Sequence, residues 1–267
     1  MGVDIKSLKS RIKSVDSTLH LTKAMGLVAS AKIRGASITM NKSREYSNAL
    51  EDTVSMLASS RACEKSEYTK KGEEGKICLI VIAGDRGLAG GYNSNVFKMA
   101  ETILSEKIIP IGKRACERYG KEQLKVETYS YEDAIFLSDR LCREFKEGMY
   151  EKIGIVYTKY VSMMSQNAEI EWILPLRKAE KKIKADIIYE PDERTVLEAV
   201  IEEYIAGKII ALTKESFACE VIARRFAMDN AGKNAGEMID NLKLQYNRAR
   251  QGAITQEITE IVAGSGM

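Results

Sequence analysis

The first residues that suggest chemistry form a glycine-rich turn, Gly84-Asp85-Arg86-Gly87-Leu88-Ala89-Gly90-Gly91. It follows an apolar run and precedes a helical pattern, which is where nucleotide-binding proteins hold a phosphate. The spacing is G-x-x-G-x-x-G-G, whereas the dinucleotide fingerprint is G-x-G-x-x-G and the phosphate loop is G-x-x-x-x-G-K-[ST]. The sequence therefore favours a structural strand-to-helix turn, and nucleotide binding is the weaker alternative.

Candidates for metal or nucleophilic chemistry are few. His20 is the single histidine and stands apart from any set of Cys and carboxylate ligands, which argues against a zinc site or a His-based triad. The five cysteines are widely spaced and include no C-x-x-C pair, so we expect buried reduced thiols: Cys63, Cys78, Cys116, Cys142 and Cys219. The sequence predicts no catalytic residue, no metal and no cofactor.

Composition indicates a folded protein built on long helices. Of 267 residues, 45% are hydrophobic and 30% charged, with a net charge of +3, which is too balanced to indicate a nucleic-acid binder. Only three prolines occur, so long uninterrupted helices are expected. Uncharged runs stop at about ten residues, and basic residues precede any apolar run at the N-terminus. We therefore expect neither a membrane span nor a signal peptide.

The first long helix is predicted from Asp4 to about Ser59. Its apolar and small residues follow 4-3-4-3 spacing, which is the a/d pattern of a coiled-coil seam. The seam positions are Leu8, Ile12, Val15, Leu19, Thr22, Gly26, Ala29, Ile33, Ala36 and Met40. Between Ala24 and Ala31 the helix is apolar on nearly every face, so something must surround it.

A second long helix is predicted from Asp192, as its N-cap, to about Ala263, with a possible break near Gly207. One apolar stripe comprises Val196, Leu197, Val200, Ile201, Tyr204 and Ile205. Another comprises Met238, Ile239, Leu242, Tyr246, Ala249, Ile254, Ile258 and Ile261. At 1.5 Å per residue the two helices span ~80 Å and up to ~105 Å, against a diameter of about 50 Å for a compact domain of this size. We therefore expect them to protrude and to pair as an antiparallel coiled coil.

Between the helices, strand and helix patterns alternate, which predicts a mainly parallel sheet covered by helices. Strands are expected at Lys76–Ala83, Ile108–Ile111, Leu124–Tyr129, Ile153–Tyr157 and Ile170–Leu174, the last two as a hairpin. Helices are expected at Asn95–Glu106, Lys113–Tyr119 and Tyr131–Phe145. The predicted fold class is α/β with long helices. Residues 1–60 and 191–267 form the coiled coil, and residues 61–190 form a central Rossmann-like α/β domain.

Two charged segments indicate contact with other proteins. Residues 1–44 hold nine basic and two acidic residues. Because these charges share the helix with its apolar seam, a solvated surface, or one that faces acidic residues of a partner protein, is favoured over a DNA-binding basic arm. Residues 246–257 mix polar donors with an apolar helix, which indicates either an ordinary polar helix end or a tip that makes directional contacts inside a partner's cavity.

Three separated motifs resemble the gamma subunit of F-type rotary ATP synthases, in order and over essentially the whole chain. The segment Leu21-Thr22-Lys23-Ala24-Met25-Gly26-Leu27-Val28-Ala29-Ser30-Ala31-Lys32 resembles the family's N-terminal helix. The Gly84–Gly91 turn is similar to Ser-Asp-Arg-Gly-Leu-Cys-Gly, with Gly84 and Ala89 as departures. Tyr189-Glu190-Pro191-Asp192, Met228-Asp229-Asn230-Ala231 and Tyr246–Glu260 resemble the C-terminal helix and the segment before it. The final Gly264-Ser265-Gly266-Met267 differs from the usual Gly-Ala ending.

The resemblance implies a rotor without catalytic residues of its own. The coiled coil would be the axle inside a hexamer of alpha and beta subunits, and the α/β domain would meet the epsilon subunit and the membrane ring of c subunits. It also implies hexamer contacts by Lys23, Met25, Arg250, Gln251, Ile254 and Ile258. The protein would lie on the cytoplasmic face of the bacterial cell membrane, with no span of its own and no nucleic acid bound.

Two other classes of protein stay open at this point. One is an enzyme that binds a dinucleotide at Gly84–Gly91, for which nucleotide binding by the isolated chain is the test. The other is a coiled-coil scaffold with an α/β head, or a zipper, which would form a stable homodimer. The rotor differs from the scaffold and the zipper because its coiled coil forms within one chain.

Overall fold

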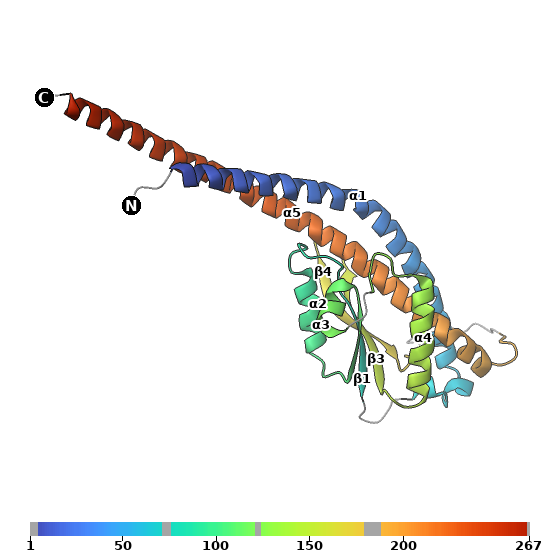
Figure 1. The fold of residues 1–267 in the computed structure, drawn as a ribbon. Helices are drawn as coiled ribbons and strands as arrows, with labels where there is room; N and C mark the ends of the chain where they lie inside the picture. Colours follow the sequence, from blue (N-terminus) through green and yellow to red (C-terminus); the bar gives the residue numbers. More distant parts are fainter. Residues whose placement is uncertain (1–4, 71–75, 121–123, 179–187, 266–267) are drawn as a thin grey trace. The chain divides into compact units, whose positions relative to one another are not determined.

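The computed structural model describes residues 5–70, 76–120, 124–178 and 188–265 (Figure 1). The chain divides into two compact units, residues 1–30 with 224–267 and residues 31–223, and each is described on its own. Both units draw on two long helices, α1 (Ile5–Ala58) and α5 (Glu193–Gly264). These bounds agree with the predicted helices. α5 continues as one helix through Gly207, so the helix is not broken at the position where a break was considered.

The start of α5 shows why a helix begins at this position. One carboxylate oxygen of Asp192, Oδ1, accepts hydrogen bonds from the backbone N–H groups of Arg194 and Thr195, each at 3.0 Å. The Thr195 hydroxyl donates to the other oxygen, Oδ2, at 2.8 Å. The bonds from Thr195 lower the pKa of Asp192. Asp192 is therefore the N-cap that the sequence predicted.

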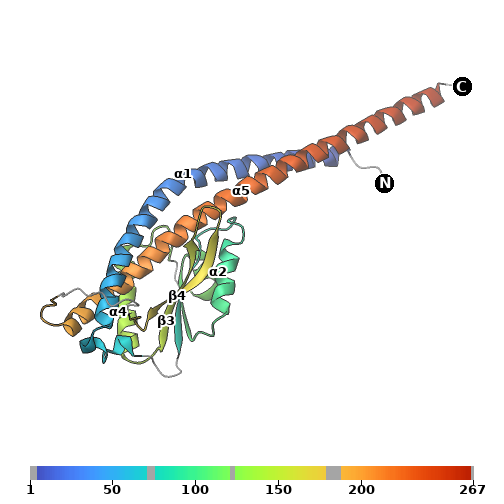
Figure 2. The ribbon, with the colours of Figure 1, turned by 180° about the vertical axis from the view of Figure 1, so that it is seen from behind.

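In the first unit α1 and α5 pack antiparallel (Figures 1 and 2). A Cβ added at Gly26 would lie 3.6 Å from Met228 Cβ, and one added at Gly232 would lie 3.6 Å from Thr22 Oγ1. Further along, Arg225 Nη1 donates to the Ser30 hydroxyl. Residue numbers thus rise along α1 as they fall along α5, which confirms the predicted antiparallel pair.

The seam that faces the partner helix follows the predicted spacing along α1, where all ten positions are buried or half-buried. On α5 the seam is shorter than predicted. Ile239 and Leu242 are buried and Tyr246 and Ala249 half-buried, whereas Met238, Ile254, Ile258 and Ile261 are exposed. Met238 is one residue from Ile239 and so points about 100° away from it. Extending the register of Thr22 against Gly232 places Ile5 near Ala249. Past Ala249 no described residue of α1 lies opposite α5.

The second unit contains a four-stranded sheet in the order β2-β1-β3-β4. The strands are β1 (Ile77–Ile82), β2 (Lys107–Ile111), β3 (Lys152–Tyr160) and β4 (Gln166–Leu174). Both β2 and β3 run parallel to β1, and β4 pairs antiparallel with β3. The predicted parallel sheet and its terminal hairpin are confirmed.

Helices cover both faces of this sheet (Figure 1). They are α2 (Tyr92–Glu101), α3 (Lys113–Tyr119) and α4 (Tyr131–Lys146), and two short 3-10 helices, Arg61–Cys63 and Glu67–Thr69, follow α1. Leu79 and Val81 of β1 share a core with α2 and α3. The alternate residues of β1, Cys78, Ile80 and Ile82, share a larger core with α4, α5 and the end of α1. This alternation is what a strand buried on both faces requires.

The strand predicted at Leu124–Tyr129 is wrong, because residues 126–128 form a turn. The backbone N–H groups of Val126 and Glu127 donate to the Asp85 carboxylate at 2.9 and 3.0 Å, so they are not available to a strand ladder. The helix predicted at Asn95–Glu106 begins earlier, at Tyr92, and ends at Glu101. Glu106 instead donates its N–H to the Ile77 carbonyl, beside β1.

Two leucines of α5 test the seam. Leu242 is 5% exposed and faces α1, whereas Leu244 is 54% exposed. We expect Leu242→Ala to lower the free energy of unfolding by about 2–4 kcal/mol, because it leaves a cavity in the seam. Leu244→Ala should change it by less than about 0.5 kcal/mol. Urea unfolding followed by circular dichroism measures both, and equal losses would contradict the seam.

Candidate functional site: two partner-contact surfaces

The glycine-rich turn after β1 is organised by the Asp85 carboxylate. Asp85 Oδ1 accepts from the backbone N–H groups of Lys113 at 3.1 Å and Val126 at 2.9 Å, and Oδ2 accepts from that of Glu127. The turn is also held to α3, because the Arg114 N–H donates to the Gly84 carbonyl at 3.1 Å. Asp85 thus joins the end of β1 to the start of α3 and to the turn before α4.

The glycines of this region are needed for close packing within the chain. A Cβ at Gly84 would lie 2.6 Å from the carboxyl carbon of Glu220 on α5, and the Gly84 N–H donates to Asn93 Oδ1 at 2.9 Å. Gly112 has φ 96°, and a Cβ there would lie 1.8 Å from the Ala83 carbonyl oxygen. The space that a phosphate would need at Gly84 is occupied by Glu220. These contacts support the structural turn over a nucleotide site.

Other side chains with potential chemistry lie apart. His20 Nε2 lies 3.7 Å from Asp16 Oδ2 on the same exposed face of α1. Residues four apart on a helix are neighbours, so the sequence alone could have predicted this pair. The five cysteines are buried and free, as expected. Within the described residues no three Cys, His, Asp or Glu side chains are grouped as metal ligands, and no helix has the length and apolar character needed to cross a membrane.

A surface on α1 exposes apolar side chains on more than one side. We call residues 21–31 the collar. Leu21 is 59% exposed, Leu27 72% and Val28 57%. At about 100° per residue, Lys23 and Leu27 lie on one side of the helix and Leu21, Met25 and Val28 on another. The predicted contact residues Lys23, exposed, and Met25, half-buried, therefore point in different directions. Exposed apolar surface of this kind is typical of interaction sites, which makes the collar a candidate contact surface.

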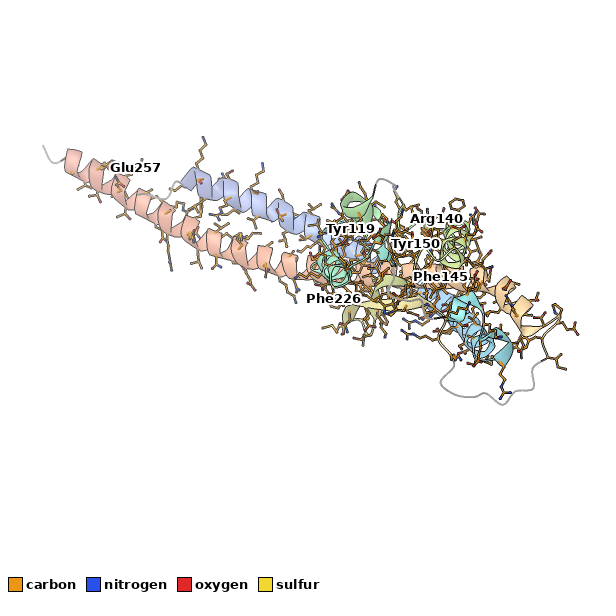
Figure 3. The ribbon with its side chains drawn as sticks, turned by 90° about the horizontal axis from the view of Figure 1, so that it is seen from below. Tyr119, Arg140, Phe145, Tyr150, Phe226 and Glu257 are labelled. Atoms are coloured by element: carbon orange, nitrogen blue, oxygen red, sulfur yellow. The ribbon has the colours of Figure 1, made fainter. Side chains whose placement is uncertain are left out.

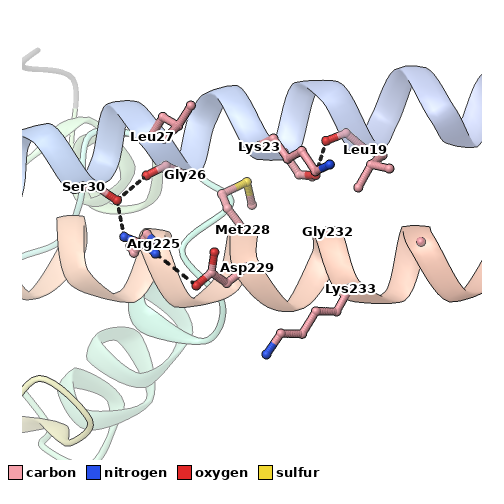
Figure 4. Close-up of a pocket in the computed structure, with 12 residues that line it drawn as sticks. Leu19, Lys23, Gly26, Leu27, Ser30, Arg225, Met228, Asp229, Gly232 and Lys233 are labelled. Atoms are coloured by element: carbon pink, nitrogen blue, oxygen red, sulfur yellow. Dashed lines mark hydrogen bonds and ion pairs between the residues drawn. The ribbon is translucent and has the colours of Figure 1, made fainter.

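A groove of about 600 Å³ lies beside the collar, between α1 and α5. It exists because small residues, Gly26, Gly232 and Gly236, line the helices there, and Lys23, Leu27 and Lys233 also contribute to its walls. Arg225 closes one end (Figure 4). Its guanidinium donates to Ser30 of α1 and lies 3.4 Å from the Asp229 carboxylate.

A second surface is formed by the last turns of α5. Arg250, Gln251, Ile254 and Ile258 fall within about 100° of the helix circumference, and we call them the tip face. Arg250 and Gln251 are exposed, Ile254 is 47% exposed and Ile258 56%. Figure 3 shows this end of α5, where Glu257 is labelled, beyond the start of α1. Gly264 and Ser265 continue the exposed end, whereas Gly266 and Met267 fall outside the described residues.

The structure thus brings four of the six predicted contact residues together on the tip face. Lys23 and Met25 lie at the collar, roughly 30 Å away along α5 by helix rise. Sequence reasoning did not find Ser30 and Arg225, which link the two helices beside the collar. A polar residue next to the seam, opposite an arginine in antiparallel register, is the signal that would have found them.

The fold as a whole matches the rotors of rotary ATP synthases. The rotor of the Euglena gracilis mitochondrial ATP synthase superposes with a TM-score of 0.67 at 18% identity, covering 94% of this chain and 98% of that one. At this identity the match establishes the fold.

Sequence comparison establishes the family. The family described as ATP synthase matches residues 4–266. The ATP synthase gamma chain of Ruminococcus albus is 40% identical, with 98% of each chain covered. That of Alkaliphilus metalliredigens is 39% identical, with 99% of each covered. The chain therefore belongs to the ATP synthase family, among the gamma chains.

Replacement of Asp85 tests the structural role of the glycine-rich turn. Asp85→Ala leaves three backbone N–H groups without their acceptor, so we expect unfolding free energy to fall by about 2–3 kcal/mol. Asp85→Asn keeps one carbonyl oxygen and should cost less. Asp240→Ala, an exposed position on α5, is the control and should change it by less than about 0.5 kcal/mol. An Asp85→Ala protein as stable as the control in urea would show that the turn does not depend on Asp85.

Proposed function

We propose that this chain is the central-stalk rotor subunit of an F-type ATP synthase, coupling ion flow through a membrane ring of c subunits to conformational change at the catalytic sites of an alpha/beta hexamer. Membership among the gamma chains over the full length supports this and does not favour the alternative of a coiled-coil scaffold with an α/β head. The coupling ion is a proton or a sodium ion. Residues 1–60 and 191–267 would be the axle and residues 61–190 the domain that faces the ring.

The observation that carries the proposal is the exposed apolar tip face. Ile254 and Ile258, followed by Ile261 at 64% exposed, form an apolar stripe on α5 past the start of α1. Full burial of an exposed isoleucine contributes about 1.5–3 kcal/mol, and each of these half-exposed side chains would gain part of that. A surrounding apolar sleeve on partner subunits would supply that burial without a fixed contact, as an axle requires.

The polar half of the tip face supplies directional contacts. Arg250 offers five N–H donors in a rigid fork, and Gln251 offers a donor and an acceptor. As the axle turns, such bonds form with one beta subunit and break with another. A partner shifts a conformational equilibrium only through contacts that differ between its states, so these bonds would favour some beta conformations over others.

The collar would make the second hexamer contact, at Lys23 and Met25. Its exposed apolar residues lie on more than one side of α1, which fits a segment enclosed by several subunits. Lys23 and Lys233 give the adjoining groove a net positive rim, since Arg225 is paired with Asp229, and this rim suits acidic residues on beta. The subunit would be non-catalytic and peripheral at the cytoplasmic face of the bacterial cell membrane. Its α/β domain would contact epsilon and the c ring.

Affinity purification of the tagged chain from membranes tests the assembly. We expect alpha, beta, epsilon and c subunits to be recovered together with the tagged chain. Recovery of a homodimer without them would favour the scaffold instead.

Truncation of the polar pair tests the tip face. We expect Arg250→Ala and Gln251→Ala to slow ATP turnover and synthesis in the reassembled complex. Loss of a charge-assisted bond costs ~1.5–3 kcal/mol, roughly ten- to hundredfold in rate if that state limits turnover. The isolated chain should keep its melting temperature, because both side chains are exposed.

Gln256 provides the control. It is exposed and lies at least about 120° around α5 from both Arg250 and Gln251, so Gln256→Ala should leave turnover unchanged. If both tip variants assemble and hydrolyse ATP at the wild-type rate, the tip face contacts the hexamer through its apolar residues alone, and the polar contacts proposed for Arg250 and Gln251 are wrong.

A further inference from the structure

Lys208 lies at a junction of three elements in the second unit. It is on α5 and its side chain is only 6% exposed. Its Nζ lies 2.7 Å from Glu51 Oε2 on α1 and 2.5 Å from Glu171 Oε1 on β4. Although burial alone would lower the pKa of Lys208, the two carboxylates raise it, so the side chain is a cation. At the preceding residue, Gly207, α1 and α5 come so close that an added Cβ would lie 2.9 Å from Leu50 Cδ1.

Glu215 forms a similar junction with the charges reversed. It lies seven residues further along α5, on the same side of the helix, and its side chain is 7% exposed. Glu215 Oε1 accepts from Arg44 Nη2 on α1 and from the Tyr160 backbone N–H on β3, each at 2.8 Å. We call the two ion pairs, Glu51–Lys208 and Arg44–Glu215, the clasp.

The order of charges in the clasp permits one register between the helices. On α1 the cation Arg44 and the anion Glu51 are seven residues apart, and on α5 the cation Lys208 and the anion Glu215 are also seven apart. A slip of seven residues would preserve the apolar seam. It would, however, place Arg44 against Lys208 in one direction, or Glu51 against Glu215 in the other. Like charges in a mostly buried site repel strongly, so the slipped state is disfavoured.

From this geometry we infer that the clasp is a register lock, which holds α1, α5 and the sheet as one body under load. The inference rests on the proposed rotor function, because a rotor domain passes torque to its axle through both helices. The hydrophobic seam alone resists separation of the helices but resists sliding poorly, because it repeats every seven residues. The ion pairs do not share that repeat, because the sign of the charge reverses at each seven-residue step along either helix. Buried ionic groups are well known for fixing register in paired helices, often with little gain in stability.

Glu51 is the position for the test, since its side chain is 46% exposed and tolerates replacement. Glu51→Gln removes one charge and Glu51→Lys reverses it toward Lys208. Lys208→Arg retains the cation. The matched control is Asp52→Lys, the same charge reversal at the next residue of α1, which is exposed.

The first measurement is the number of ions pumped per ATP hydrolysed by reassembled complexes in vesicles, with the hydrolysis rate taken on the same sample. We expect Glu51→Lys to lower this ratio at least twofold while hydrolysis continues, and Glu51→Gln to fall between. Lys208→Arg and Asp52→Lys should match wild type. A wild-type ratio in assembled Glu51→Lys complexes overturns the lock, and if that variant does not assemble, Glu51→Gln decides by the same criterion.

The second measurement uses the isolated full chain and does not depend on the rotor function. Amide hydrogen exchange in residues 45–55 of α1 should be at least tenfold faster in Glu51→Lys than in Asp52→Lys. Equal exchange overturns the lock even if the chain is a rotor subunit. Failure of the wild-type chain to assemble with alpha and beta subunits overturns the proposed function alone.

Discussion

Burial of one helix on all sides holds this structure together. From Tyr204 to Ile222, nearly every side chain of α5 is buried, because the sheet covers one side and α1 with α4 covers others. A helix can be buried in this way because its backbone hydrogen bonds are satisfied internally. Polar side chains in this segment find partners that the fold supplies, as Thr213 does by donating to the Ile209 carbonyl at 2.7 Å and Lys214 by donating to the Tyr129 carbonyl at 2.7 Å. The same helix that completes the α/β core therefore also provides one half of the coiled coil.

The enclosed segment of α5 and its C-terminal segment therefore place different requirements on the amino-acid sequence. Where α5 is enclosed, its side chains must be apolar or must meet polar partners within the fold. In the first unit only a narrow seam is covered, and past Ala249 no described part of the chain covers it. Isoleucines exposed on that last stretch lower the solubility of the free chain, a cost that the enclosing partner proposed above would offset. The collar of α1 follows the same principle.

The spacing of apolar residues predicted the helices and most of the sheet correctly, because those elements depend on residues that are close together in the sequence. The a/d spacing from Leu8 to Met40 predicts which residues are covered, and Asp192 predicts where α5 begins. What local rules cannot show is a side chain that takes backbone donors from distant segments. Leu124–Tyr129 has the composition of a strand, yet the N–H groups of Val126 and Glu127 donate to Asp85, some forty residues earlier. The clasp is equally non-local, since only the paired register reveals that Arg44 and Glu51 meet Glu215 and Lys208. Of the contact residues, the grouping on the tip face and the different directions of Lys23 and Met25 both follow from helical phase. Which of these faces is left exposed follows only from the pairing of α1 with α5.

The unbroken helix between the seam and the tip face also constrains how gamma chains can change in length. Deleting one residue between Leu242 and Arg250 would turn the tip face by about 100° relative to the seam and draw it back by about 1.5 Å. Seven residues would nearly restore its direction but move it by about 10 Å. No short insertion or deletion in this segment preserves both the direction and the height of Arg250. Variation in length among relatives is therefore expected in the loops of the α/β domain. The segment of α5 from Leu242 to Arg250 should have the same length in all of them.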